Sequence, residues 1–452
     1  MKLNSISRNH ECFKKFGSGM EKVFSSVAAI DPNDKESLVG FDFAGTPQGQ
    51  LKHFVSNGQS IGYMVFFENL ETATAAAQEV LITDQLDLNL DWSTFSFGDM
   101  QIGEKIINVP EGDNNFQSTV DLRPDISALV EVNCNLKLAT GAFECLFRGK
   151  DPDTGELADF LPPNTDAVDP RGRGWISFSI MPKTGLPTGT VIKNKATIDF
   201  EVGIPPDPMD TPEVFNTIDS DTPTSGVLPL SSAYTTTDFK VSWSGSDGES
   251  GSGLRDYTIY VSDNGGDYTP WLTNTTATSA EFIGQFGHTY RFYSIARDNV
   301  GNEEDPPQQP DTQVSINASD KLIAVYTNRS SYTTGDNLKL LVSLNNPGKA
   351  IVADAFLGFM LPDGSLYFFD SSLSNLIPAQ TNDPRTFTAA RTSLDIPGSF
   401  SLPPTEVFSV RLPELAEGDY IAFAALAEPG SVQAGSPRII GEVSLAYITF
   451  SK

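Results

Sequence analysis

Turn-forming residues interrupt this chain at short intervals. Gly (37) and Pro (30) together make up about one in seven of its 452 residues, which leaves little room for long helices, because both disrupt a helix interior. Short runs rich in β-branched and aromatic residues lie between the interruptions, and no amphipathic helical pattern separates them. This spacing predicts an all-β chain of β-sandwiches and argues against a parallel α/β sheet.

Three segments carry these runs, which agrees with about 150 residues per domain. Residues 1–28 are predicted to form a flexible leader, and the first unit spans 29–210, where GIPPDPMDTP indicates a stiff linker. A second unit is predicted at 222–317 and a third at 320–452. The three units are expected to follow one another in series.

The charge balance excludes one class of partner. The chain has 58 acidic and 30 basic side chains and a formal net charge of −28, so a nucleic-acid backbone would repel it. No window of about 18 apolar residues predicts membrane insertion. The first twenty residues lack the apolar region of a secretory signal. Either the protein is cytoplasmic, or the sequence is part of a longer exported protein.

No catalytic motif is recognisable. The histidines are His10, His53 and His288, and neither a nucleophile elbow, a zinc-ligand spacing nor a phosphate-binding loop accompanies them. Composition leaves open a two-carboxylate glycosidase, but small sandwiches lack the deep cleft such enzymes use. We therefore predict that the chain is not an enzyme.

Calcium is the cofactor that the acidic residues suggest. Asp31, Asn33 and Asp34 offer three side-chain oxygens within four residues, and Asp219 and Asp221 lie at the next predicted junction. Ca²⁺ takes six to eight oxygen ligands in flexible geometry, so such loops suit it. Bound ions would stiffen the joints between sandwiches. The alternative is that Asp-Pro-Asn-Asp forms a turn through its own backbone.

Two cysteines flank a predicted hairpin. Cys134 and Cys145 lie in alternating runs around Ala139-Thr140-Gly141, which is typical of two antiparallel strands. They could form a cross-strand disulfide in an oxidising compartment. The alternative is a pair of buried free thiols.

Tyr268 and Trp271 are the candidate ligand-binding aromatics. They lie in GGDYTPWL, a predicted loop, where exposed rings could stack on a sugar. The alternative is that they cover the edge of the sandwich. Trp243, in FKVSWSGSD, is predicted to lie in the core.

The second unit resembles fibronectin type III and related immunoglobulin-like domains over residues 222–317. Tyr290 stands where this family can anchor a corner through a tyrosine hydroxyl, and Ser294 departs from the larger apolar residue usual there. The other residues that carry the resemblance are Trp243, Tyr257, Tyr260, Phe292 and Ala296.

The first unit resembles the DUF11-like conserved-repeat modules of bacterial envelope and secreted proteins, with the hairpins around the cysteines as an insertion. The residues that carry this resemblance are Asp31 to Lys35, Phe67-Glu68-Asn69, Thr72 to Ala75, Thr83-Asp84, Gly189-Thr190 and Asn194 to Ala196. For the third unit only a general β-sandwich is predicted.

These resemblances imply three immunoglobulin-like sandwiches in a structural or adhesive segment of an exported or cell-surface bacterial protein. The expected partner is a cell-surface protein or a polysaccharide. The alternative is an accessory carbohydrate-binding segment of a secreted hydrolase.

Overall fold

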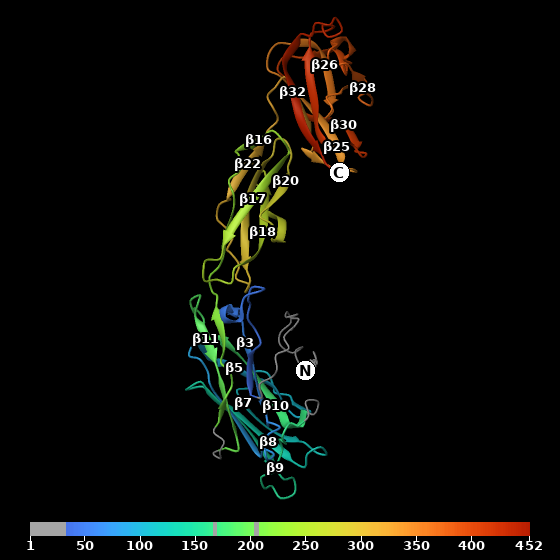
Figure 1. Cartoon of the computed structure of the whole chain (residues 1–452). Coiled ribbons are helices and arrows are strands. Elements are labelled where there is room, and N and C mark those ends of the chain that lie inside the picture. The colour runs from blue at the N-terminus through green and yellow to red at the C-terminus, as the bar shows by residue number, and fades with distance from the viewer. Residues whose placement is uncertain (1–32, 166–169, 203–207) are drawn as a thin grey trace. The chain divides into compact units, whose positions relative to one another are not determined.

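The computed structural model describes residues 33–165, 170–202 and 208–452, and nearly all of its regular structure is β-strand (Figure 1). The prediction of an all-β chain of sandwich units is confirmed. The predicted leader at 1–28 lies outside the described residues. The chain divides into two compact units. One comprises Met1–Asp221, Gly248–Ser252 and Asn299–Asn302, and the other comprises Thr222–Asp247, Gly253–Asp298 and Glu303–Lys452.

The first compact unit contains three sheets. A five-stranded sheet has the order β1-β3-β10-β5-β6, a six-stranded sheet the order β13-β12-β4-β9-β8-β7, and a small sheet the order β11-β14-β2. The strands are β1 (Asp34–Ser37), β2 (Phe54–Val55), β3 (Ile61–Glu68), β4 (Glu79–Gln85), β5 (Leu90–Ile102), β6 (Lys105–Ile107), β7 (Asn115–Asp121), β8 (Leu129–Lys137), β9 (Ala142–Lys150), β10 (Arg173–Pro182), β11 (Val191–Asn194), β12 (Ala196–Phe200), β13 (Met209–Asp210) and β14 (Val214–Ile218), with the short 3₁₀ helices η2 (Gln48–Gln50) and η3 (Pro170–Gly172).

Alternating apolar residues of these strands form one core rich in phenylalanine. Phe95, Phe97, Phe143 and Phe178 are buried with ring centroids 4.7–5.9 Å apart. Such tilted and edge-on ring contacts add to the free energy of burial. The hairpin of β8 and β9 contributes to this core, because β9 pairs with β4 in the six-stranded sheet.

The predicted linker near residue 210 is in part strand. Met209–Asp210 forms β13 beside β12, and the following strand β14 pairs with β11 and β2. The first unit therefore extends to Ile218, past the predicted boundary, because this last strand completes its small sheet.

The second compact unit begins with a sandwich that has its own hydrophobic cluster around Trp243 and Phe292. Its sheets have the orders β15-β17-β20 and β16-β22-β21-β18-β19, an immunoglobulin-type arrangement. The strands are β15 (Thr224–Val227), β16 (Ala233–Tyr234), β17 (Asp238–Ser246), β18 (Leu254–Asp263), β19 (Thr269–Thr275), β20 (Ser279–Ile283), β21 (Thr289–Asp298) and β22 (Thr312–Ile316).

A second sandwich in this unit repeats the same strand order, with β28 and β29 added to its larger sheet. Its sheets run β23-β25-β30 and β24-β32-β31-β26-β27-β28, with β29 beside β26. It too has a separate core, which includes Leu340 and Phe369. The elements are β23 (Ile323–Thr327), β24 (Ser331–Tyr332), β25 (Asn337–Asn346), β26 (Ile351–Met360), β27 (Leu366–Phe369), β28 (Leu376–Ala379), η4 (Pro384–Thr386), β29 (Arg391–Ile396), β30 (Phe400–Arg411), β31 (Gly418–Ala427) and β32 (Ile439–Phe450).

Both sandwiches of the second unit fix a corner with a tyrosine. The Tyr290 hydroxyl, near the start of β21, accepts a hydrogen bond from the Gln285 backbone N–H at 3.0 Å. This is the contact that the fibronectin-like motif predicts. At the corresponding place in β31, the Tyr420 hydroxyl donates to the Ala416 carbonyl at 2.8 Å. This second corner was not predicted from the sequence.

A short early strand pairs in parallel with a late strand in each sandwich. The parallel pairs are β2 with β14, β16 with β22, and β24 with β32. All other pairings between named strands in the described ranges are antiparallel. None of the helices in those ranges has the length and apolar character needed to cross a membrane.

Candidate functional site

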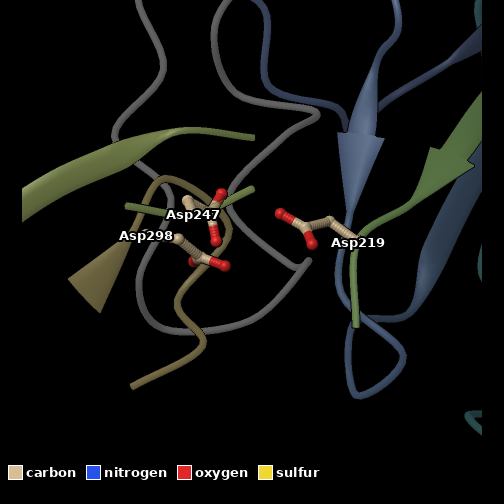
Figure 2. A group of neighbouring side chains, drawn as sticks. All are labelled: Asp219, Asp247 and Asp298. Atoms are coloured by element: carbon tan, nitrogen blue, oxygen red, sulfur yellow. The ribbon is translucent and has the colours of Figure 1, made fainter. Parts of the chain in front are cut away.

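Three buried aspartates form the main acidic cluster. Asp219 directly follows β14, Asp247 directly follows β17, and Asp298 is the last residue of β21. Carboxylate oxygens of the three residues lie within 4.8 Å of one another (Figure 2). Asp219 and Asp298 are completely buried, and Asp247 is 7% exposed. Like charges held this close in a low-dielectric environment repel each other, so the cluster could hold a cation.

Two backbone N–H groups donate to these carboxylates. The Ser252 N–H donates to Asp219 Oδ2 at 2.7 Å, and the Gly253 N–H donates to Asp247 Oδ2 at 2.7 Å. The Ser252 side chain is completely buried, and among the described residues its hydroxyl has no hydrogen-bond partner. A buried hydroxyl without a partner is unfavourable by about 1–3 kcal/mol. This oxygen is therefore a further potential ligand.

The other predicted metal ligands do not join this cluster. Asp31 lies outside the described residues. Asn33 is buried, with its amide 3.8 Å from the sulfur of Met209, and Asp34 begins β1 opposite Phe66. Asp221 is exposed, and its backbone N–H donates to Thr188 Oγ1 at 3.0 Å. Of the four predicted ligands that the structure describes, only Asp219 lies in the cluster.

The two candidate cysteines face each other on paired strands. Cys134 in β8 is the direct partner of Cys145 in β9, and a disulfide joins them. Both side chains are completely buried. The cross-link therefore lies inside the first core, where it ties the middle of one strand to its neighbour.

The two candidate aromatics have different surroundings. Trp271 lies within β19, where its ring contacts Trp243, Phe282 and Phe292 edge-on at 5.2–6.3 Å. These contacts agree with the alternative that Trp271 covers the edge of the sandwich. Tyr268 is half-buried and contacts Tyr293 at 4.7 Å.

A row of three tyrosines was not anticipated. Tyr293 contacts Tyr268 and also stacks on Tyr260 at 4.8 Å. All three rings are half-buried. Tyr260 and Tyr293 are direct partners on β18 and β21, and local sequence patterns do not contain this pairing of distant strands. Together they form the tyrosine row Tyr260, Tyr268 and Tyr293.

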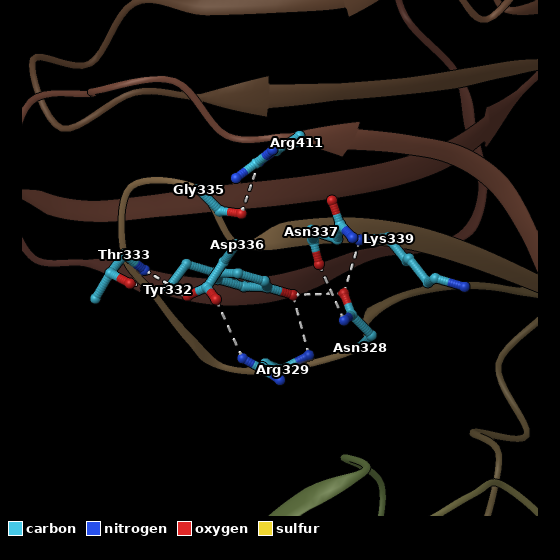
Figure 3. Close-up of polar contacts among 9 residues, drawn as sticks. All are labelled: Asn328, Arg329, Tyr332, Thr333, Gly335, Asp336, Asn337, Lys339 and Arg411. Carbon is cyan, nitrogen blue, oxygen red and sulfur yellow. Dashed lines mark hydrogen bonds and ion pairs between the residues drawn. The ribbon is translucent and has the colours of Figure 1, made fainter.

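A hydrogen-bonded segment connects β23 to β25 in the last sandwich (Figure 3). The Tyr332 hydroxyl accepts from the Arg329 N–H at 3.0 Å and donates to Asn328 Oδ1 at 2.8 Å. Asn328 in turn accepts from the Lys339 N–H at 2.7 Å. Burial raises the pKa of Tyr332 to about 12. The phenol therefore stays protonated at neutral pH and keeps its role as donor.

Charged side chains close the same turn. Asp336 accepts from the Thr333 N–H at 2.8 Å and lies 3.4 Å from the Arg329 guanidinium. Arg411 donates to the Gly335 carbonyl at 3.2 Å. The contacts shown in Figure 3 thus hold the loop between β24 and β25 in place, and no ligand is needed to explain them.

Comparisons with solved structures give only distant similarities. The collagen-binding domain from a Staphylococcus aureus adhesin is 10% identical and covers 42% of this chain and 99% of that chain, with a TM-score of 0.22. Domains D2 and D3 of the major pilin SpaD from Corynebacterium diphtheriae are 10% identical. The match covers 63% of this chain and 97% of the pilin chain, with a TM-score of 0.22. The fibronectin(III)-like modules of Clostridium thermocellum CbhA are 11% identical. The match covers 50% of this chain and 95% of the CbhA chain, with a TM-score of 0.17. Scores this low carry no argument about fold or function.

The sequence comparisons are more limited still. No curated protein matches the chain. The resemblance of the first unit to DUF11-like modules stays a prediction. Residues 31–109 match the family described as "Domain of unknown function (DUF7619)".

Proposed function

We propose that this chain is a non-catalytic structural or adhesive segment of an exported bacterial surface protein. The observation that carries the proposal is the parallel pairing of an early strand with a late strand in every sandwich. When a sandwich is pulled by its two ends, hydrogen bonds between parallel strands at those ends are loaded together. An antiparallel pair pulled from one end would open bond by bond. This geometry suits a protein that bears load.

The buried disulfide supports an extracellular location. Disulfides persist in oxidising compartments and are rare in the cytosol. The expected partner is a cell-surface protein or a polysaccharide, bound by exposed loops and sheet faces.

Pulling the chain by its ends in a force spectrometer tests the load-bearing role. We expect Tyr234→Pro to lower the unfolding force of one sandwich, because proline removes a backbone donor from β16. The matched control is Tyr234→Ala, which also removes the ring that stacks on Phe239 at 4.7 Å but keeps the backbone N–H. Equal forces for the two variants would contradict the proposal.

We further propose that Ca²⁺ binds Asp219, Asp247 and Asp298. The proximity and burial of the three carboxylates support this, and the buried Ser252 hydroxyl supplies a further oxygen. Ligand binding to the folded state alone raises its stability by mass action. We expect millimolar Ca²⁺ to raise the melting temperature relative to EDTA and Asp298→Asn to abolish the rise. The exposed Asp267→Asn is the control, and no calcium-dependent shift in the wild type would refute the site.

A carbohydrate-binding segment is the second candidate function, and the tyrosine row favours it. Partly exposed aromatic rings offer flat apolar faces to sugar rings. Sedimentation with insoluble polysaccharides would show binding that Tyr293→Ala weakens. Trp271→Phe serves as the control, because the Trp271 ring packs on Trp243, Phe282 and Phe292. Equal binding by wild type and Tyr293→Ala would remove the tyrosine row from consideration.

A further inference from the structure

Three buried polar side chains lie around Tyr63 in the core of the first unit. Lys35 comes from β1, Asp84 from β4 and Asn194 from the end of β11. All three are less than 5% exposed. A lysine is almost never fully buried unless it is paired. The first unit therefore places a charged group where an apolar residue is normal.

The contacts of Lys35 define the cluster. Its Nζ contacts Asp84 Oδ2, and both side chains are completely buried. The same Nζ lies 5.2 Å from the ring centres of Tyr63 and Phe178. The amine is thus enclosed by one carboxyl group and two aromatic rings.

Asn194 is a further neighbour of Tyr63. Asp84 pairs with Ala196, two residues beyond Asn194, and both of these residues are buried. The Asn194 side chain also lies close enough to the Tyr63 hydroxyl to lower its pKa, although burial raises that pKa overall. Tyr63 is therefore a neighbour of both the lysine amine and the asparagine amide.

The cluster has too few hydrogen bonds for its polar atoms. Across the described ranges, both amide atoms of Asn194, the Tyr63 hydroxyl and Asp84 Oδ1 have no hydrogen-bond partner. Each such buried atom is unfavourable by about 1–3 kcal/mol. An uncharged, fully bonded product would remove most of this penalty.

We propose that Lys35 Nζ and Asn194 Cγ join in an intramolecular isopeptide bond, with Asp84 as the acid–base group. The proposal does not depend on the proposed function. It rests on burial and on the three side chains brought together by β1, β4 and β11.

The reaction needs no external reagent. A proton first passes from the lysine ammonium to the Asp84 carboxylate, which leaves a neutral amine and a carboxylic acid. The amine attacks Cγ of Asn194 while the acid protonates the amide oxygen. Asp84 then carries a proton from Nζ to Nδ2. The Cγ–Nδ2 bond breaks, ammonia leaves, and the proton on the former amide oxygen returns to the Asp84 carboxylate, so that the new amide is neutral. One amide replaces another, so nothing is oxidised or reduced.

Burial favours the required protonation states. It lowers the pKa of the Lys35 amine to about 8, against the effect of Asp84. It also raises the pKa of the Asp84 carboxyl, against the effect of Lys35. A neutral amine beside a neutral acid is the pair from which the attack can start.

The product would suit its surroundings better than the separate side chains. The new amide N–H can donate to Asp84, and its carbonyl can accept from the Tyr63 hydroxyl. Asp84 is the only carboxylate among these side chains. If Asp84 were itself the acceptor of the amine, no acid would remain in the cluster to move the protons. Asn194 is therefore the reacting partner.

The mass of the intact, reduced chain tests the proposal. We expect the wild type to be lighter than its sequence mass by one ammonia. Digestion after glutamate should give a branched peptide that joins residues 22–36 to residues 157–201. Lys35→Met and Asn194→Ala should each have the full sequence mass, and Lys193→Ala, an exposed neighbour, should keep the loss.

Each outcome decides the matter. Loss of one ammonia with the expected branched peptide establishes the bond, and an Asp84→Ala variant with its full sequence mass assigns the acid–base role. A wild-type chain with its full sequence mass overturns the proposal. Loss of water in place of ammonia overturns it as well, because the bond would then run to Asp84. Since the deciding measurement uses the wild type, a variant that fails to fold leaves the test intact.

Discussion

Opening the Cys134–Cys145 disulfide should lower the free energy of unfolding of the first unit by about 3 kcal/mol. The cysteines are 11 residues apart, and closing a loop of that length removes about 9 cal/mol/K of entropy from the unfolded chain, or about 3 kcal/mol at 25 °C. The sulfurs are completely buried in a core of packed rings. Replacing them with smaller side chains adds a packing loss that reduction alone does not cause.

Urea unfolding of three samples separates the two effects. They are the oxidised wild type, the reduced wild type and the double variant Cys134→Ala/Cys145→Ala, with Cys12→Ser as the control for the third cysteine. We expect the reduced wild type to lose about 3 kcal/mol and the double variant to lose more. If the reduced and oxidised proteins unfold at the same urea concentration, the loop-closure argument fails. If only the double variant is weaker, packing explains the whole effect.

Other contacts lead to predictions of the same kind. Tyr290→Phe should lower the stability of its sandwich by about 1 kcal/mol, because one part-buried hydrogen bond is lost; in urea unfolding, Tyr260→Phe should change little. Tyr420→Phe should have a similar effect on the last sandwich, and an unchanged midpoint would show that its corner is unimportant. Donation from the Ser372 hydroxyl and the Asn375 amide lowers the pKa of the exposed Asp370 carboxyl. The resulting stabilisation of its loop is fully present above the unfolded pKa of about 4 and is lost progressively as the pH falls from there through the lower pKa of the folded state. The backbone amides of Ser372 and Asn375 should therefore be better protected against hydrogen exchange at pH 5 than at pH 2, once the intrinsic pH dependence of exchange is allowed for. Asp370→Asn should remove this difference.

The sequence predicted best where side chains alternate. The run GWISFSIMP forms β10, and its buried residues are those that alternation places inward, together with Ser177. Strand β30 was only partly expected, because Pro403 and Pro404 interrupt the pattern. Proline removes a backbone donor, so it is confined to sheet edges. Strand β30 is indeed an edge strand of its three-stranded sheet.

Buried polar residues were harder to find. Asp247 and Asp298 join Asp219 only after strands distant in sequence come together, and local patterns do not contain that information. Asp84 and Asn194 did leave a signal. Each stands at an inward position of an alternating run, where an apolar residue is expected. Treating such a position as buried would have identified both residues.

The shared strand order of the last two sandwiches has a consequence for folding during synthesis. Neighbouring domains with the same topology can exchange strands and become trapped as misfolded pairs. Their core residues differ, however. The inward side chains of β17 include Phe239 and Trp243, whereas those of β25 include Leu338 and Leu340. A strand moved into the neighbouring core would leave voids or clash, so the divergence of the two sequences protects each sandwich from the other.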